Sequence, residues 1–347
     1  MRRVTAGLFG LGGGSLLVVL ALAGCPGGAT PPGFPGKGGD KASSVDPNTC
    51  GNYAASEAGA KLKAFLEATV ALNETVVKME AEVKVSCSAM AEKLGVKAEG
   101  DTEAVCHAVS EAIKANLKAG IKGKAAFKVD YKPAVCTVNA DLAVDAVAKC
   151  EAKASADVKV RCSGTCKGTC EGACKGKCEG SAGGGGGKGE CKGKCSGTCE
   201  GSCSGGCEGS ADVEASAECK AKAEVSANVE AECTEPELNI EYDAKVVVDK
   251  PKVEAVAEAL KAGLPQLVSA HAKLEGPIAL TVKNWEKTAK NLAKASAKLY
   301  KSLGDQAACV GGQLAAAANM VGKVKGSVSV SVEASASVSS SAGASGG

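Results

Sequence analysis

The stretch of sequence that decides the fold is a pair of cysteine repeats, CSGTCKGTCEGACKGKC at Cys162–Cys178 and CKGKCSGTCEGSCSGGC at Cys191–Cys207. Each repeat has a cysteine at every fourth position and a glycine midway between, and a glycine run lies between the repeats. The cysteines are placed symmetrically about the bond between Gly184 and Gly185. Such symmetry is the pairing rule of an antiparallel hairpin, with its turn at 184–185 where glycine accepts positive φ freely.

The same symmetry continues outside the repeats and predicts a ladder of disulfides along the hairpin. A step of four residues returns to the same face of a strand and to the same class of pairing site. Directly opposed Cα atoms lie within reach of a disulfide, and the intervening glycines leave room for each bridge. The predicted pairs are Cys136–Cys233, Cys150–Cys219, Cys162–Cys207, Cys166–Cys203, Cys170–Cys199, Cys174–Cys195 and Cys178–Cys191.

The segments flanking the repeats alternate between small or apolar residues and polar residues. Even positions are small or apolar from Cys136 to Cys162, and odd positions are so from Cys207 to Cys233. Alternation with a period of two predicts strands with one dry face. The abundance of Ala, Lys and Glu leaves a helix as the alternative, because these residues favour helices over strands.

Two prolines extend the symmetry toward the helical part of the chain. Pro133 and Pro236 lie equally far from the turn, and proline interrupts a ladder, so we expect a matched bend there. Beyond the bend we expect Phe127, Val129 and Tyr131 to oppose Tyr242, Ile240 and Leu238, respectively. The predicted hairpin therefore covers residues 121–248.

Helical periodicity occupies the chain on both sides of the hairpin. Apolar residues recur at steps of three or four in 50–120 and again in 249–322, which predicts a small helical bundle made from both ends of the chain. Cys87 and Cys106 lie at similar distances from the turn between the first two helices, so we pair them. Cys50–Cys309 then follows by elimination.

The C-terminal tail, residues 323–347, allows two interpretations. SVSVSVEASASV, from Ser327 to Val338, alternates as a strand does. It predicts either a third strand beside the base of the hairpin or, because serine is abundant, a disordered end.

The N-terminal 25 residues, MRRVTAGLFGLGGGSLLVVLALAGC, carry two arginines, an apolar run and Leu22-Ala23-Gly24-Cys25. This pattern resembles the signal peptide and lipobox of bacterial lipoproteins. The resemblance implies a signal peptide at 1–24, lipidation of Cys25 and a chain outside the cytoplasm; an uncleaved membrane anchor is the alternative. Residues 25–49 are rich in Pro and Gly and predict a flexible tether.

Composition and motifs argue against several classes of function. Without residues 1–24 the chain has 39 basic and 39 acidic residues and few aromatics, so we expect no nucleic-acid partner. No C-x-x-C occurs, and no nucleophile pattern accompanies the two histidines, so we expect no enzyme, no catalytic residue and no cofactor. Zinc sites usually use shorter cysteine spacings and often histidine, so we expect no metal ligands.

These features together predict an α+β fold, with a long disulfide-laddered antiparallel β-hairpin inserted in a small helical bundle. We expect a lipid-anchored structural or adhesive protein of the cell envelope that presents a stiff β projection. The alternatives are a thiol-rich metal-binding protein and a periplasmic partner-binding module. The expected partners are the membrane, through the N-terminal lipid, and a second copy through the Gly/Ala/Cys face. Pro26, rather than Asp, follows the lipid site and favours the outer membrane.

Overall fold

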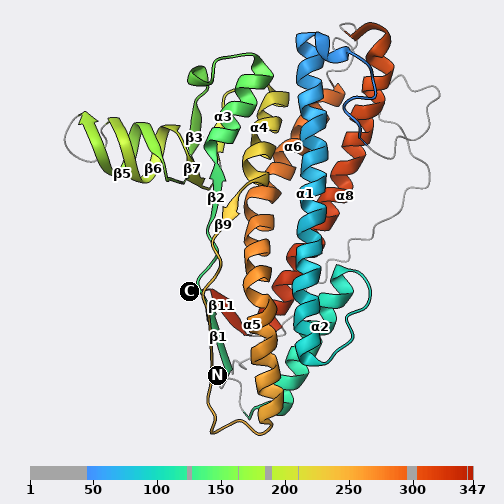
Figure 1. The fold of residues 1–347 in the computed structure, drawn as a ribbon, viewed down its shortest axis with the longest axis vertical. Helices are drawn as coiled ribbons and strands as arrows, with labels where there is room; N and C mark the ends of the chain where they lie inside the picture. The colour runs from blue at the N-terminus through green and yellow to red at the C-terminus, as the bar shows by residue number, and fades with distance from the viewer. Residues whose placement is uncertain are drawn as a thin grey trace, which may run out of the picture. The chain divides into compact units, whose positions relative to one another are not determined.

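The protein has an α+β fold in which helices from both ends of the chain form a bundle and the middle of the chain forms disulfide-bonded strands (Figure 1). The predicted signal peptide, Cys25 and most of the tether lie outside the described residues. The computed structural model describes residues 45–122, 127–162, 164–183, 190–209, 211–294, 303–341 and 343–346.

Long helices make up the bundle, as the helical periodicity predicts. The first, α1, contacts α2, α5 and α8, and at 1.5 Å per residue its 38 residues span about 57 Å. Ser56 caps its start by accepting a hydrogen bond from the backbone N–H of Gly59, and Gly95 ends it with a φ of 68°. The helices are α1 (Glu57–Leu94), α2 (Thr102–Gly120), α5 (Lys250–Lys273), α6 (Ala279–Lys294) and α8 (Ala307–Ser341), with a π-helical segment (Leu274–Ile278) joining α5 to α6.

The bundle core contains the one tryptophan of the chain. Trp285 of α6 is fully buried and stacks on Phe65 of α1, with the ring centroids 5.6 Å apart. Its indole Nε1 donates a hydrogen bond to Thr69 Oγ1 at 3.0 Å. A buried indole N–H needs such a partner, so Thr69 fixes the position of the largest side chain in the core.

The C-terminal tail is helical, which corrects both interpretations of Ser327–Val338. This segment belongs to α8, whose buried side chains recur at helical steps: Val324, Val328, Ser331, Ser335 and Val338. Ser335 on this face fits a helix because its hydroxyl bonds to the preceding turn, donating to the Ser331 carbonyl at 2.7 Å. A short strand, β11 (Ala344–Gly346), follows and pairs in parallel with β1.

Two of the alternating segments are also helices, so the prediction of continuous strands from 121 to 248 is wrong. Helix α3 (Ala140–Glu151) begins at Asn139, whose side chain accepts hydrogen bonds from the N–H groups of the first turn. Helix α4 (Ala217–Val229) packs against α1, α3 and α6, and its small residues are buried on most sides. Burial on most sides of α4, together with the helix propensity of Ala, Lys and Glu in both segments, explains the misleading alternation.

The strands near the bundle pair as the symmetry predicts. In the antiparallel pair of β1 (Phe127–Tyr131) with β10 (Leu238–Tyr242), Phe127 faces Tyr242, Val129 faces Ile240 and Tyr131 faces Leu238. β2 (Cys136–Asn139) pairs with β9 (Glu232–Cys233), and Cys136 faces Cys233. Beyond α3 and α4 come β3 (Val160–Cys162), β4 (Thr165–Cys166), β5 (Thr169–Gly183), β6 (Glu190–Cys203), β7 (Gly206–Glu208) and β8 (Ala211–Val213).

Candidate functional site

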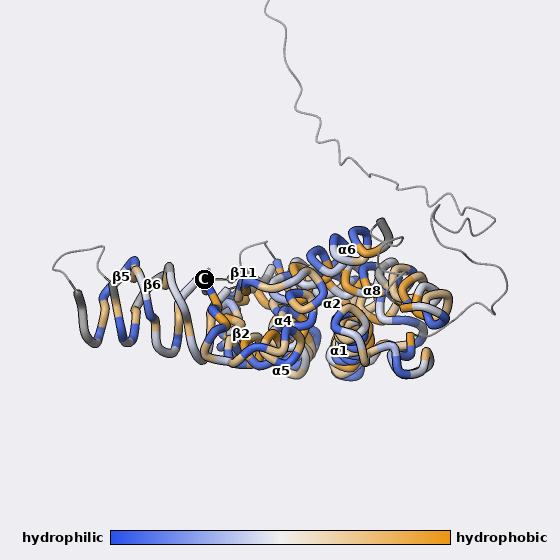
Figure 2. Tube along the Cα trace, turned by 90° about the horizontal axis from the view of Figure 1, so that it is seen from above, coloured by the Kyte–Doolittle hydropathy of each residue, from blue (hydrophilic) through white to orange (hydrophobic). Residues whose placement is uncertain are grey.

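The two cysteine repeats form a wound coil and not a flat ladder. Cys170 of β5 faces two residues of β6, Gly193 on one edge and Cys203 on the other, which are ten residues apart. A strand can pair with the same partner strand on both edges only if the two-stranded ribbon winds around an axis. One turn therefore uses ten residues of each strand, and Figure 2 shows the turns from the side.

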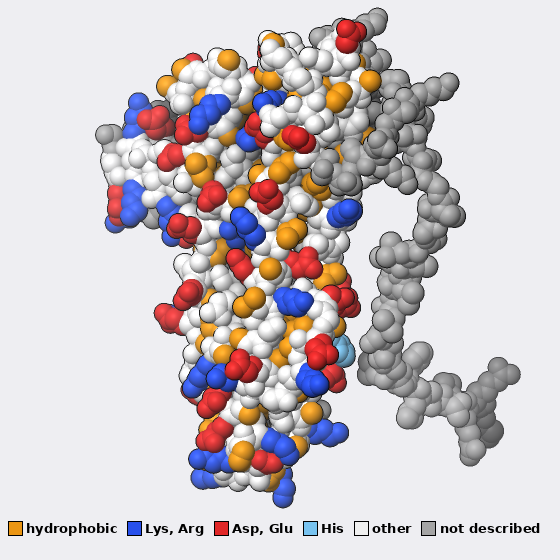
Figure 3. All heavy atoms as spheres, turned by 45° about the vertical axis from the view of Figure 1, so that its right-hand side comes forward, with side chains coloured by type: hydrophobic (Ala, Val, Ile, Leu, Met, Phe, Trp, Pro, Cys, Tyr) orange, Lys and Arg blue, Asp and Glu red, His pale blue; other side chains and the backbone are white. Residues whose placement is uncertain are grey.

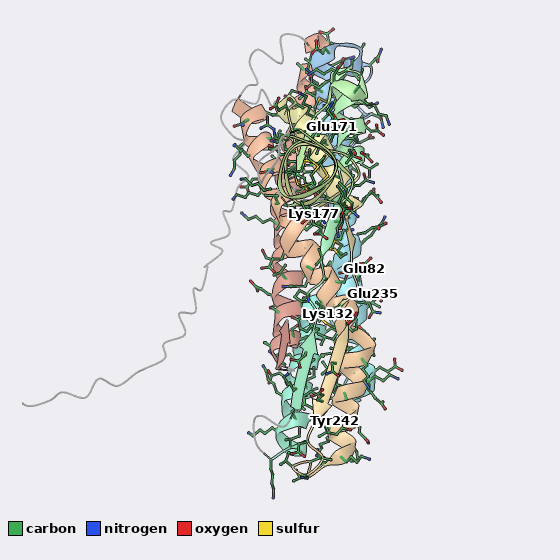
Figure 4. All side chains as sticks on the ribbon, turned by 90° about the vertical axis from the view of Figure 1, so that its left-hand side faces the viewer. Glu82, Lys132, Glu171, Lys177, Glu235 and Tyr242 are labelled. Atoms are coloured by element: carbon green, nitrogen blue, oxygen red, sulfur yellow. A yellow bond between two sulfur atoms is a disulfide. The ribbon has the colours of Figure 1, made fainter. Side chains whose placement is uncertain are left out.

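Winding shortens the projection. Two neighbouring strands lie about 4.8 Å apart, so the coil advances about 10 Å per turn, whereas ten extended residues would span about 33 Å. The projection is therefore a short coil of a few turns and not the long extended hairpin that the sequence predicts. Figure 4 looks along the coil, where β5 and β6 form rings with the labelled Glu171 and Lys177 on the outside.

The interior of the coil is filled by disulfides. Cys174 faces Cys199 across the strand pair but is bonded to Cys195, four residues earlier in β6, with the Cα atoms of Cys174 and Cys195 5.8 Å apart. Four residues are nearly half of a ten-residue turn, so each bond crosses the middle of the ring. The cysteines of the repeats are almost completely buried, except Cys178 at the tip, which is partly exposed.

Among the described residues, nine disulfides join the pairs that we expected, although the register of β5 with β6 differs from the expected one. They are Cys50–Cys309, Cys87–Cys106, Cys136–Cys233, Cys150–Cys219, Cys162–Cys207, Cys166–Cys203, Cys170–Cys199, Cys174–Cys195 and Cys178–Cys191. In the coil the register is shifted from the expected symmetry by one four-residue repeat. Because cysteines recur every four residues, both registers place cysteine opposite cysteine in most of the ladder.

The glycines between the cysteines make room for the neighbouring backbone. A Cβ atom on Gly201 would lie 2.2 Å from the Glu171 carbonyl oxygen, and one on Gly193 would lie 2.4 Å from the Glu179 carbonyl oxygen. Both distances are far inside van der Waals contact. We expected these glycines to make room for the disulfides, but the tight winding requires them because it brings the strands' backbones so close.

The outer surface of the coil carries charges that match in the observed register. Glu179 faces Lys194, and Glu171 faces Lys192 on the other edge. The symmetric register would have placed Lys175 opposite Lys194, and like charges in directly opposed positions destabilise a strand pair. On the face of the molecule shown in Figure 3, acidic and basic side chains are likewise interspersed.

Short hydrogen bonds fix the base of the coil to α3. β7 pairs with β2, and the Ala140 N–H donates to the Gly205 carbonyl at 2.7 Å. The Gly205 N–H in turn donates to an Asp141 carboxylate oxygen at 2.9 Å. Cys150–Cys219 then joins α3 to α4. The coil is thus held to α3 by backbone pairing and by the N-terminal turn of that helix, and the disulfide joins α3 to α4.

Glu151 connects this unit to the bundle. One of its oxygens accepts a hydrogen bond from the Ser216 N–H at 2.7 Å, and the other lies 3.2 Å from the Lys61 ammonium group of α1. Hydrogen bonding from Ser216 and the pairing with Lys61 outweigh the opposite effect of burial, and they lower the pKa of Glu151 to about 2. The ionised carboxylate is therefore part of the folded structure.

An open groove of about 520 Å³ lies where β2 and β7 approach α4 and the π-helical segment. Its lining is mostly apolar and includes Val135 and Leu280, which are 44% and 39% exposed. Asn228, another lining residue, donates from Nδ2 to Thr281 Oγ1 at 2.5 Å. Its Oδ1 is buried and accepts no hydrogen bond from the described residues.

Disulfides account for all the cysteines of the described residues. No group of three or more His, Cys, Asp or Glu side chains in this part of the chain is arranged to hold a metal ion. Within the same residues, no helix combines the length and apolar character needed to cross a membrane. No family model, curated protein or solved structure matches the chain.

Proposed function

We propose that the protein is a lipid-anchored structural or adhesive component of the cell envelope that presents the coil as a rigid surface element. The observation that carries this proposal is the interior of the coil, where disulfides stand in place of an apolar core. A segment closed in this way cannot open without breaking covalent bonds, which suits a mechanical or adhesive role.

The same bonds support a compartment outside the cytoplasm. Disulfides persist in oxidising environments outside the cytoplasm, which agrees with the lipobox at Leu22–Cys25. The tether would separate the bundle from the membrane, and the outer membrane is the membrane we favour because Pro26 follows Cys25.

Metabolic labelling with radioactive palmitate tests the anchor. The full-length protein should incorporate the label and fractionate with the outer membrane, and Cys25→Ala should lose the label. Labelling of the Cys25→Ala protein, or a wild-type protein without label in the soluble fraction, would contradict the proposal.

Cell adhesion tests the role of the coil. Cells that produce a Cys174→Ser/Cys195→Ser variant should attach or aggregate less than wild-type cells at equal surface abundance. The Cys87→Ser/Cys106→Ser variant is the control, because it removes one disulfide from the bundle and leaves the coil intact. Equal loss in both variants would point to general instability and against a role of the coil.

Partner binding by the helical part is a second candidate function, and the groove beside Asn228 favours it. Leu280→Lys would place a charge in that groove while leaving the coil unchanged. Loss of adhesion in this variant, with full adhesion in the Cys174→Ser/Cys195→Ser variant, would assign the adhesive function to the groove and not to the coil. The metal-binding alternative predicts tight zinc or cadmium uptake by protein purified without reductant.

A further inference from the structure

The disulfide between Cys136 and Cys233 differs from the others in its exposure. Both of its cysteines are partly exposed, whereas each of the other eight disulfides of the described residues has at least one buried cysteine. The two residues are directly opposed in the β2–β9 pair, with their Cα atoms 3.9 Å apart. This bond is therefore the one that a thiol in solution can approach at both ends.

Each cysteine of this bond lines a different cavity. Cys136 lines the groove of about 520 Å³ beside Asn228, and Cys233 lines a second cavity of about 240 Å³ together with residues of α1 and α5. Exchange with a thiol needs access for the attacking sulfur at one end of a disulfide and a place for the leaving thiolate at the other. The larger groove provides the access, and the smaller cavity receives the thiolate.

We propose that Cys136–Cys233 is a site of thiol–disulfide exchange, whose substrate is a thiol of a small molecule or of another protein. The attacking thiolate sulfur bonds to Cys136 Sγ, the bond between the two Sγ atoms breaks, and its electron pair leaves with Cys233. A second thiolate then displaces Cys136 from the mixed disulfide. Two thiols are thereby oxidised to one disulfide, and Cys136–Cys233 is reduced to two thiols.

The other partly exposed cysteines offer poorer leaving groups, because each is bonded to a buried cysteine. The pairs are Cys150–Cys219, Cys178–Cys191 and Cys309–Cys50, with the buried member second. Apolar burial raises the pKa of a thiol, and a thiolate of high pKa leaves more slowly. Exposure of one sulfur is therefore not enough for fast exchange.

Cys233 leaves into a cavity that contains charged groups. Lys273 lines this cavity, and its ammonium group donates to the Val229 carbonyl at 2.9 Å. An ammonium group near a thiolate stabilises it. The carboxylates of Glu82 and Glu235, labelled side by side in Figure 4, line the same cavity and oppose the thiolate.

Exchange at this site would loosen the base of the coil without opening the coil. The chain between Cys136 and Cys233 contains α3, the coil and α4, and the disulfides of the coil and Cys150–Cys219 lie within it. These bonds stay closed when Cys136–Cys233 is reduced. The exchange depends neither on the lipid anchor nor on the adhesive role proposed above.

Stepwise reduction tests the site. Full-length protein in detergent is incubated with rising concentrations of glutathione, quenched with N-ethylmaleimide and digested for mass spectrometry. Cys136 and Cys233 should react before any other pair. Cys136→Ser/Cys233→Ser should lose this first reaction, and Cys150→Ser/Cys219→Ser, the control, should keep it. Another pair that opens first, or no pair that opens before denaturant is added, would overturn the proposal.

Charge removal tests the leaving group. Glu82→Gln/Glu235→Gln should speed the first reaction by about threefold or more, because two carboxylates no longer oppose the Cys233 thiolate. Glu103→Gln, exposed on α2, is the matched control and should leave the rate unchanged. An unchanged or slower rate in the double variant would overturn the assignment of Cys233 as the leaving group.

Two thiols distinguish the sources of the substrate. Glutathione represents a small thiol and reduced thioredoxin a protein thiol, and each rate with Cys136–Cys233 is divided by the rate of the same thiol with cystine. A higher ratio for thioredoxin would assign a protein partner, and a higher ratio for glutathione would assign a small thiol. No reaction with either would overturn the proposal, whatever the outcome of palmitate labelling.

Discussion

Substituting Gly201 with alanine separates the wound coil from a flat ladder. In the coil the new Cβ atom would lie 2.2 Å from the Glu171 carbonyl oxygen and 2.7 Å from the Gly172 Cα atom. Both contacts are with backbone, so β5 and β6 must move apart by about 1 Å. Such overpacking costs about 1–3 kcal/mol, and weakening two neighbouring hydrogen bonds adds about 1 kcal/mol for each. In a flat ladder the added methyl group would face the neighbouring disulfides and not the backbone of the partner strand, so it would not force β5 and β6 apart.

Hydrogen exchange followed by mass spectrometry measures this loss of stability in the coil itself. A loss of about 3 kcal/mol should speed exchange of the amides around Glu171–Cys174 and Cys199–Cys203 by about a hundredfold. Gly276→Ala is the control, because Gly276 lies in the π-helical segment with no atom near the added Cβ, and it should leave exchange in the coil unchanged. Unchanged or slower exchange in the Gly201→Ala protein would refute the winding.

Three further predictions concern the helical parts. Because the pKa of Glu151 is about 2 in the folded protein and 4.5 for an unpaired glutamate carboxyl group, its stabilising effect is present above pH 4.5 and is lost as the pH falls toward 2. Glu151→Gln should therefore lower the free energy of unfolding by about 1–2 kcal/mol near neutral pH, allowing for solvent screening, and should not lower it near pH 2. Urea titrations at the two pH values measure this difference, and an equal loss at both would contradict the prediction. Thr69→Val leaves the Trp285 Nε1–H buried without an acceptor and should destabilise the bundle by about 1–3 kcal/mol. Urea unfolding followed by fluorescence measures this loss, and a midpoint equal to that of wild type would contradict the prediction. Val338→Asp buries a charge in α8 and should lower the thermal midpoint, while Ser340→Asp, at an exposed position, should not; equal midpoints would mean that the end of α8 does not pack.

The sequence predicts the covalent framework better than the course of the backbone. Symmetric spacing is a property of the cysteines alone, so it points to pairs such as Cys174–Cys195 whether or not the ribbon winds. It cannot distinguish registers that differ by one four-residue repeat. The charges hold that information, because the symmetric register sets Lys175 opposite Lys194, whereas the observed one sets Glu179 there.

Alternation misled the secondary-structure prediction at three segments for a shared reason. In α3, α4 and the end of α8 the apolar residues are mostly Ala and Val and are spread around the helix, so a period of two and a period of 3.6 fit equally well. Asn139 as an N-cap was a local signal for α3 that the sequence does contain. The packing of α4 against α1 and α6 depends on residues far away in the chain, and no local pattern reveals it.

Through-space proton contacts measured by NMR across β5 and β6 test the wound coil most directly. The coil predicts that Gly172 is close to Gly201 and also to Cys191, one partner on each edge of the strand. The symmetric flat hairpin would instead bring Gly172 close to Gly197 alone. Contacts from Gly172 to both Gly201 and Cys191 would establish the winding, and a contact to Gly197 without the other two would contradict it.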